Sequence, residues 1–253
     1  MLYLAFAFFV TALLYAAVGF GGGSTYNALL VLAGVDYRIL PAIALVCNII
    51  VVSGGVWRFA SAGHIRLKRI APWIITSIPA AWIGGRIPVS EVVFVGLLGL
   101  SLAAAGLRML LQKSDTGSEP REENRLVLAL PIGAGLGFIS GLVGIGGGIF
   151  LAPILHLLRW DKARAIAGTC SLFILVNSLS GLAGQFAKLS ETDLLGPLGA
   201  HWPLFPAVLI GGQIGSFLGA KQLSEQILRR MTALLVLYVA ARLLLRWAHL
   251  IAG

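Results

Sequence analysis

Long apolar runs without Asp, Glu, Lys or Arg dominate this sequence and constrain its fold more than any other feature. Only 11% of the residues are charged, whereas a soluble domain carries about 25%. Runs of roughly 16 residues or more approach or exceed the length at which a helix crosses about 30 Å of hydrocarbon. They are Leu2–Val35, Ile39–Trp57, Ile70–Gly85, Val92–Leu107, Leu126–Leu158, Ala165–Ala187 and Trp202–Ala220, and a last apolar stretch, Ile227–Ala241, has Arg229 and Arg230 near its start. The sequence therefore predicts an all-α polytopic membrane protein.

The formal net charge of +9 has a similar explanation. Most basic residues lie in short loops between apolar runs, as they do in the cytoplasmic loops of membrane proteins. The charge therefore indicates contact with membrane lipid and no nucleic-acid partner. Cys47 and Cys170 lie inside apolar runs without a CxxC partner, so neither a disulfide framework nor a zinc site is expected.

Two glycine-rich motifs, GFGGG at 19–23 and GIGGG at 144–148, interrupt the two longest apolar runs. Glycine costs roughly 1 kcal/mol relative to alanine inside a helix. The segments that follow the motifs match in order: Ala42–Asn48 resembles Ala165–Ser171, Ser53–Phe59 resembles Ser180–Phe186, and Ala80–Arg86 resembles Gly215–Lys221. These matches predict an internal duplication with a first repeat at 1–111, a polar cytoplasmic linker at 112–125 and a second repeat at 126–253.

The loop charges predict that the two repeats are inverted in the membrane. The loop at 61–69 is purely basic, whereas its counterpart at 188–201 has one Lys and two acids. Because positive loops stay in the cytoplasm, the bias changes sides between the halves, as in an inverted repeat. Arg242 and Arg246 run against this rule, and a parallel repeat of four spans per half is the alternative. In the inverted scheme, each half of four segments opens with a Gly-rich re-entrant or broken helix.

The glycine motifs are candidates for anion binding. Successive glycines can direct several backbone N–H groups at one point, and a helix that starts after each motif would present free N–H donors and a partial positive charge. The candidate residues are Gly21, Gly22 and Gly23 in the first motif and Gly146, Gly147 and Gly148 in the second. Close packing of membrane helices is the structural alternative.

Neutral polar residues inside the runs complete the candidate site. They are Ser24, Thr25, Asn48, Thr169, Ser171 and Asn177. Asn48 and Ser171 occupy equivalent places in the two repeats, which favours a position near the pseudo-axis. For each side chain alone, an interhelical hydrogen bond is the alternative role.

These paired motifs and their order resemble the TauE/SafE family of sulfite and sulfonate exporters. The resemblance covers nearly the whole chain. It departs from the family pattern at Ala28, where proline is common, and at Val46-Cys47-Asn48, where a Thr-Ser pair is common. The resemblance implies a transporter of a small sulfur-containing anion in a bacterial-type inner membrane.

The expected mechanism is an exporter that binds its anion near the bilayer midplane between the two turns and works by alternating access. The runs contain no Asp or Glu for a proton relay, and no cofactor, metal or catalytic residue is expected. An anion or small-solute channel is the alternative. A membrane enzyme is disfavoured because the four histidines are scattered. The sequence leaves the oligomeric state open, a homodimer included.

Overall fold

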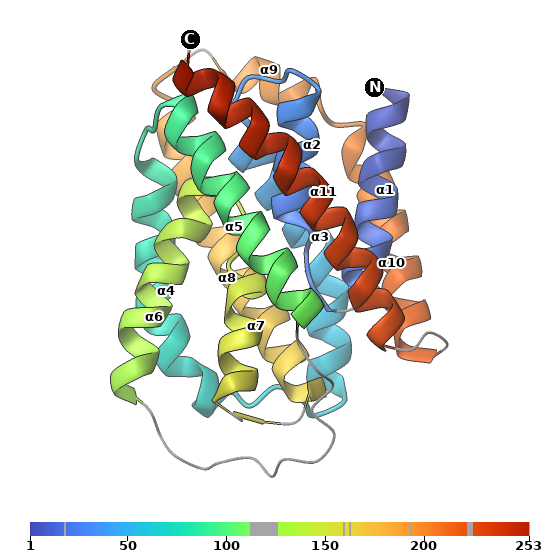
Figure 1. The fold of residues 1–253 in the computed structure, drawn as a ribbon. Coiled ribbons are helices and arrows are strands. Elements are labelled where there is room, and N and C mark those ends of the chain that lie inside the picture. Colours follow the sequence, from blue (N-terminus) through green and yellow to red (C-terminus); the bar gives the residue numbers. More distant parts are fainter. Residues whose placement is uncertain are drawn as a thin grey trace.

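The structure, a computed structural model, describes residues 1–17, 19–111, 126–158, 160–161, 163–192, 194–221 and 225–252. Within these ranges it is all-helical, without a strand (Figure 1). The first half contains α1 (Leu2–Ala17), α2 (Gly23–Leu32), α3 (Leu40–Ser61), α4 (Leu67–Arg86) and α5 (Glu91–Leu111). The second half contains α6 (Leu126–Val143), α7 (Gly148–Leu157), α8 (Ala163–Leu189), α9 (Leu195–Gly199), α10 (Leu204–Lys221) and α11 (Glu225–Ala252).

Every apolar run forms helix, which confirms the predicted fold class at this level. The two longest runs are each divided at the glycine motif, into α1 and α2 and into α6 and α7. At 1.5 Å per residue, the ten-residue helices α2 and α7 are about 15 Å long, roughly half the thickness of a bilayer core. The short helix α9 was not expected from the sequence. The linker at 112–125 lies outside the described residues.

Among the described residues, three helical spans are long and apolar enough to cross a membrane by themselves: Leu40–Ser61, Glu91–Arg108 and Arg164–Leu189. The outer surface of the molecule is also apolar. Trp57 is 76% exposed and Val127 is 85% exposed, and many other large hydrophobic side chains are similarly open. The buried side chains, in contrast, include Asn27, Asn48 and Gln185. A surface of this kind is suited to lipid rather than to water.

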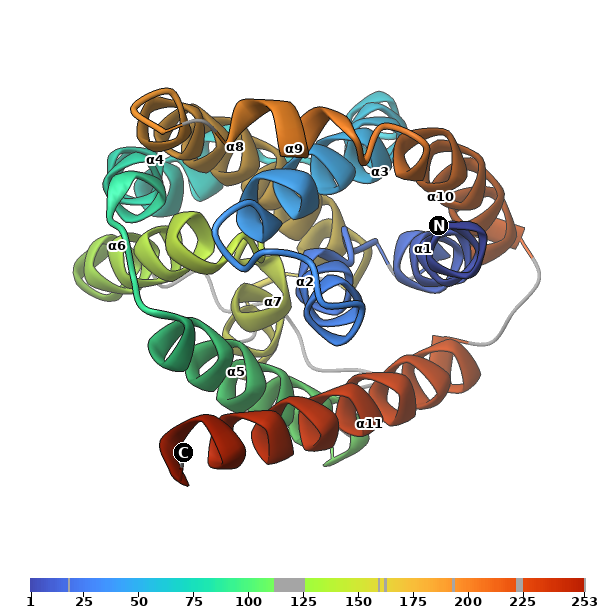
Figure 2. The same cartoon turned by 90° about the horizontal axis from the view of Figure 1, so that it is seen from above.

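The most extensive helix contacts in the described chain join one half to the other. Helix α1 packs on α10, α4 packs on α6 and α8, α3 packs on α8, and α5 packs on α11. Figure 2 shows α1 beside α10 and α4 beside α6 at opposite sides of the molecule, with α2 and α7 near its middle. The half-helices α2 and α7 are therefore enclosed by helices from both halves.

The two ends of the molecule carry its ion pairs. At the lower end in Figure 1, Asp161 between α7 and α8 forms ion pairs with Arg66 and Arg69 at the start of α4. At the upper end, Arg246 of α11 pairs with Glu91 at 2.7 Å and donates to the Val31 carbonyl at 2.6 Å. The pair with Glu91 neutralises Arg246, one of the two arginines whose predicted position at the outer face is contrary to the preference of basic residues for the cytoplasmic side.

Candidate functional site

The two glycine turns have the same left-handed conformation at two matched positions and differ at a third, where Gly146 has a φ of 83° and its counterpart Gly21 is not left-handed. Gly19 and Gly22 have φ of 84° and 91°, and their counterparts Gly144 and Gly147 have φ of 76° and 75°. The Gly22 carbonyl accepts from the N–H groups of residues 25 and 26, and the Gly147 carbonyl accepts from those of residues 150 and 151. A left-handed residue reverses the chain and starts a new helix at each motif, and only glycine adopts this conformation without a Cβ penalty. The sequence duplication is thus reproduced in local structure.

The tips of the two turns lie against each other. Asn27 of α2 donates from Nδ2 to the Val143 carbonyl at 2.6 Å and makes a longer bond of 3.4 Å to the Gly144 carbonyl. A Cβ added at Gly23 would come within 2.7 Å of the Gly144 carbonyl oxygen. The N-terminus of α2 therefore abuts the end of α6.

Asn48 of α3 binds both turns. Its Oδ1 accepts a hydrogen bond from the Gly23 N–H at 2.8 Å, and its Nδ2 donates to the Ile145 carbonyl at 3.2 Å. The side chain is completely buried. The Gly23 N–H, expected to be a free donor, is thus occupied by an amide oxygen. That oxygen lies at a helix N-terminus, the position at which proteins commonly bind anions.

Ser171 of α8 makes the reciprocal contact. Its hydroxyl donates to the Gly19 carbonyl at 2.8 Å. Asn48 comes from the first half and bonds the second turn, whereas Ser171 comes from the second half and bonds the first turn. The matched pair noted in the sequence therefore cross-links the two halves at their centre.

The glycines of both motifs are also required by packing. A Cβ at Gly21 or Gly23 would collide with the Asn48 amide, and one at Gly146 would lie 2.7 Å from Ile174 and 2.9 Å from Asn48 Nδ2. A Cβ at Gly148 would collide with Ile174. Gly22 faces Tyr26 and Thr11, and Gly147 faces Phe173. Gly21, Gly23, Gly146 and Asn48 thus form one cluster, and Gly22 and Gly147 flank it.

The other predicted site residues form no described hydrogen bond with this cluster. Thr25 is 2.8 Å from the Tyr15 hydroxyl and joins α2 to α1, and its neighbour Ser24 is buried. Asn177 donates to the Phe173 carbonyl within α8, and its Oδ1 has no described partner. The Thr169 hydroxyl is buried and likewise without a partner among the described residues. The structure therefore brings some predicted residues together and leaves Thr25, Thr169 and Asn177 outside this cluster.

Several polar residues near the turns had not been selected as site residues. Asn27 connects the turns, and the Tyr26 hydroxyl lies close to Gly22, where an added Cβ would be 3.2 Å away. The Ser178 hydroxyl lies near Gly146, where an added Cβ would be 3.3 Å from its oxygen. The hydroxyls of Tyr26, Ser140 and Ser178 have no described partner. The sequence does point to Asn27, which follows the first motif together with the polar residues Ser24 and Thr25, whereas it carries no such signal for Ser140 and Ser178.

No cluster of three or more His, Cys, Asp or Glu side chains that could hold a metal ion occurs among the described residues.

Short helices that begin at glycine turns near the centre of an all-helical, lipid-compatible molecule also occur in membrane transporters. Comparison with known proteins places the chain more closely. The chain belongs to the sulfite exporter TauE/SafE family, whose family model matches residues 4–243.

The relatives are named as transporters. A probable membrane transporter protein of Sinorhizobium fredii, y4hK, is 35% identical over 95% of this chain and 97% of its own. The probable membrane transporter protein YjnA of Bacillus subtilis is 29% identical over 81% of this chain and 86% of its own. No solved structure matches the chain significantly. The protein is therefore a membrane transporter of the TauE/SafE family, as the sequence resemblance predicted.

Proposed function

We propose that the protein exports a small sulfur-containing anion, such as sulfite or an organosulfonate, across a bacterial-type inner membrane. The anion binds between the two glycine turns at the level of Gly21–Gly23 and Gly146–Gly148. The observation that carries this proposal is the Asn48 bridge, in which an amide oxygen caps the N-terminus of α2 and an amide nitrogen reaches the second turn. An anion oxygen replaces Asn48 Oδ1 on the Gly23 N–H, where the helix dipole favours negative charge.

We also propose that the two halves form an inverted repeat and work by alternating access. The helix packing supports this proposal. In the repeat, α1 corresponds to α6 and α4 corresponds to α10. Helix α1 packs on α10, and the corresponding helices α6 and α4 pack on each other in the same way. In Figure 1, α2 lies in the upper half of the molecule and α7 in the lower half, as opposed half-helices would. Rocking of one packed unit against the other would expose the central turns to each side in turn.

Transport by purified protein in liposomes tests the proposal. With the interior negative, export of one elementary negative charge gains about 2.3 kcal/mol per 100 mV, so efflux of a loaded anion should accelerate under that potential. Efflux should saturate with substrate concentration and show counterflow. A flux that is linear in concentration and without counterflow would identify a channel instead. No flux of sulfite, sulfonates or thiosulfate under any potential would refute the proposed substrate class.

Variants at the turns locate the binding site. Gly22→Ala and Gly147→Ala place a side chain at φ of 91° and 75° against Tyr26 and Phe173 respectively, so substrate binding should be lost. Gly34→Ala is the matched control, since Gly34 has φ of 75° and nothing within 4 Å of an added Cβ. It carries the same backbone strain away from the turns, and its anion binding should equal that of the wild type. Unchanged binding in both turn variants would remove the turns from the mechanism.

A further inference from the structure

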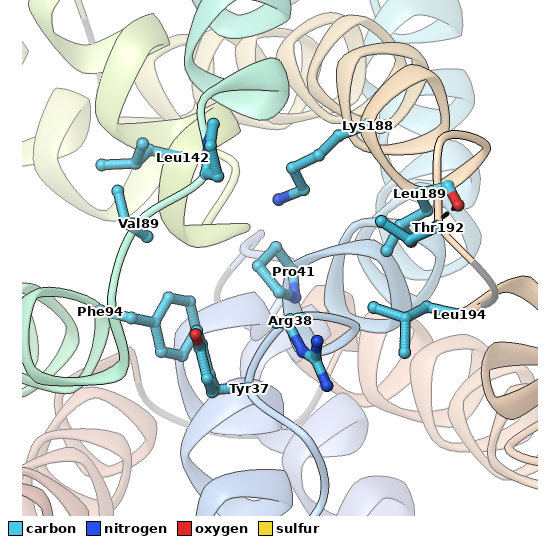
Figure 3. A pocket seen from close by; sticks show the side chains of 11 residues that line it. Tyr37, Arg38, Pro41, Val89, Phe94, Leu142, Lys188, Leu189, Thr192 and Leu194 are labelled. Atoms are coloured by element: carbon cyan, nitrogen blue, oxygen red, sulfur yellow. Dashed lines mark hydrogen bonds between the residues drawn. The ribbon is translucent and has the colours of Figure 1, made fainter.

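A pocket of about 120 Å³ lies above the second glycine turn. Its walls come from the α2–α3, α4–α5 and α8–α9 connections and from the helices beside them (Figure 3). Because a water molecule takes about 30 Å³ in the liquid, this space can hold several waters or one small solute. Its lining is mainly apolar, with Val89, Phe94 and Leu142 on one side and Pro41 at its centre.

The pocket leads toward the central turns. Pro41 lines it and also packs on the second turn, since a Cβ at Gly144 would lie 2.6 Å from Pro41 Cα. Leu142, another lining residue, directly precedes that turn in the chain. Pro41 thus lies between the pocket and the start of the second glycine turn.

Lys188 supplies the positive charge of this pocket. Figure 3 shows its side chain reaching from α8 into the space beside Pro41. The other lining cation, Arg38, is already bound to Asp36 at 2.6 Å. The remaining carboxylates with described side chains are also engaged, Glu91 by Arg246, Asp161 by Arg66 and Arg69, and Glu191 by Arg86. No described side chain therefore neutralises the Lys188 ammonium.

A cation without a described counter-ion beside mainly apolar walls indicates the chemical class of ligand. A compact inorganic oxoanion would lose hydration against Val89, Phe94 and Leu142 without replacement. An anion with a short hydrocarbon body can place its head on the ammonium and bury its methylenes against the walls. We propose that the pocket is an outer binding site for small organic anions, with Lys188 contacting the charged head. The idea that transported anions pass through this pocket rests on the proposed function. Binding of an anion in the pocket can be tested independently of transport.

Calorimetric titration of the purified protein with butanesulfonate tests the site. Lys188→Met should weaken binding about tenfold or more, because a charge-assisted hydrogen bond is lost. Lys188→Arg should retain it. Lys68→Met is the matched control, an exposed lysine at the start of α4 at the other end of the molecule, and should bind as the wild type does. Affinity should rise from methanesulfonate to butanesulfonate by up to about fourfold per methylene.

The two proposals fail in different ways. Equal butanesulfonate affinity in the wild type and Lys188→Met, each with an unchanged melting temperature, would overturn the outer site while leaving transport through the turns intact. Tighter Lys188-dependent binding of sulfite than of butanesulfonate would overturn the organic-anion class. Absence of any anion flux, with Lys188-dependent binding retained, would overturn the proposed function and keep the outer site.

Discussion

At the scale of single residues, Asn48 is the side chain on which the centre of the molecule depends. It is an acceptor toward one turn and a donor toward the other, two roles that a side-chain amide fills with its separate oxygen and nitrogen atoms. Its counterpart, Ser171, uses a hydroxyl for the one bond that it makes. The two residues differ because their tasks differ, although they occupy equivalent positions in the two repeats.

Asn48→Asp should abolish transport, because a carboxylate accepts hydrogen bonds but donates none. The new negative charge would face the Ile145 carbonyl and repel an anion at the turns. Efflux assays on proteoliposomes with equal amounts of protein measure the effect. Asn48→Ala separates repulsion from lost bonding: it leaves two buried polar groups unpaired, at about 1–3 kcal/mol each, and should lower the melting temperature in detergent. Transport by Asn48→Asp at the wild-type rate would contradict this account.

The residues that meet at the centre of the candidate site could be predicted in part from the sequence. The glycine motifs and the Asn48/Ser171 pair were recognisable because the duplication repeats them at matched places. The occupied Gly23 N–H was not, since it depends on a contact between residues 25 positions apart in the chain. Lys188 was also missed as a binding residue: in the sequence it is one cation in a loop, and only packing brings it beside Pro41.

At the scale of elements, the ion pairs of Asp161 in the α7–α8 connection are more deeply buried than the ion pair of Asp36 in the α2–α3 connection. The Asp161 side chain, between α7 and α8, is 3% exposed and bonds Arg69 at 3.0 Å and Arg66 at 3.3 Å. Arg69 also lies over the Trp160 ring at 4.6 Å from its centroid. Its counterpart by repeat spacing, Asp36 between α2 and α3, bonds only the neighbouring Arg38 among the ion pairs described, and both are solvent-accessible.

Asp161→Asn and Asp36→Asn should therefore have unequal effects on stability. Loss of the buried carboxylate removes the pairs with Arg66 and Arg69, although Arg69 keeps its bond to the Trp160 carbonyl, and should cost about 1.5–3 kcal/mol. The exposed pair should contribute about 0–1 kcal/mol. Thermal unfolding in detergent, followed by intrinsic fluorescence, should show a clear drop in the melting temperature for Asp161→Asn and little change for Asp36→Asn. Similar shifts for both variants would mean that the Asp161 pairs do not fasten α4 to the α7–α8 connection.

Element boundaries were well predicted where glycine fixed them. Helices α2 and α7 begin at Gly23 and Gly148, the last residues of the two motifs. The pairing of helices was beyond the sequence, because apolar faces on so many helices do not specify their neighbours. Which helix faces meet is decided by small residues: a Cβ at Gly137 or Gly141 of α6 would collide with the backbone of α4.

At the scale of the whole molecule, the inverted and parallel arrangements make opposite predictions for accessibility. Thr192, after α8, and Ala62, after α3, are exposed and belong to corresponding loops of the two halves. In an inverted repeat these loops face opposite sides of the membrane, whereas in a parallel repeat they share one side.

Cysteine labelling distinguishes the two arrangements. A membrane-impermeant maleimide should label Thr192→Cys in intact cells, and Ala62→Cys only after the cells are permeabilised. Cys47 and Cys170 are completely buried, so the parent protein should remain unlabelled and serves as the control. Labelling of both variants from the same side would establish the parallel arrangement.

The packing of first-half helices on second-half helices also determines the order in which the protein can fold during synthesis. Helix α1 is made first, but the helix that covers it, α10, leaves the ribosome late, and α4 must wait in the same way for α6. Long-range pairing of this kind delays folding until distant segments exist. The first half therefore remains in the bilayer without its partners during synthesis, and a gene divided within 112–125 should give active protein only when both pieces are produced in the same cell.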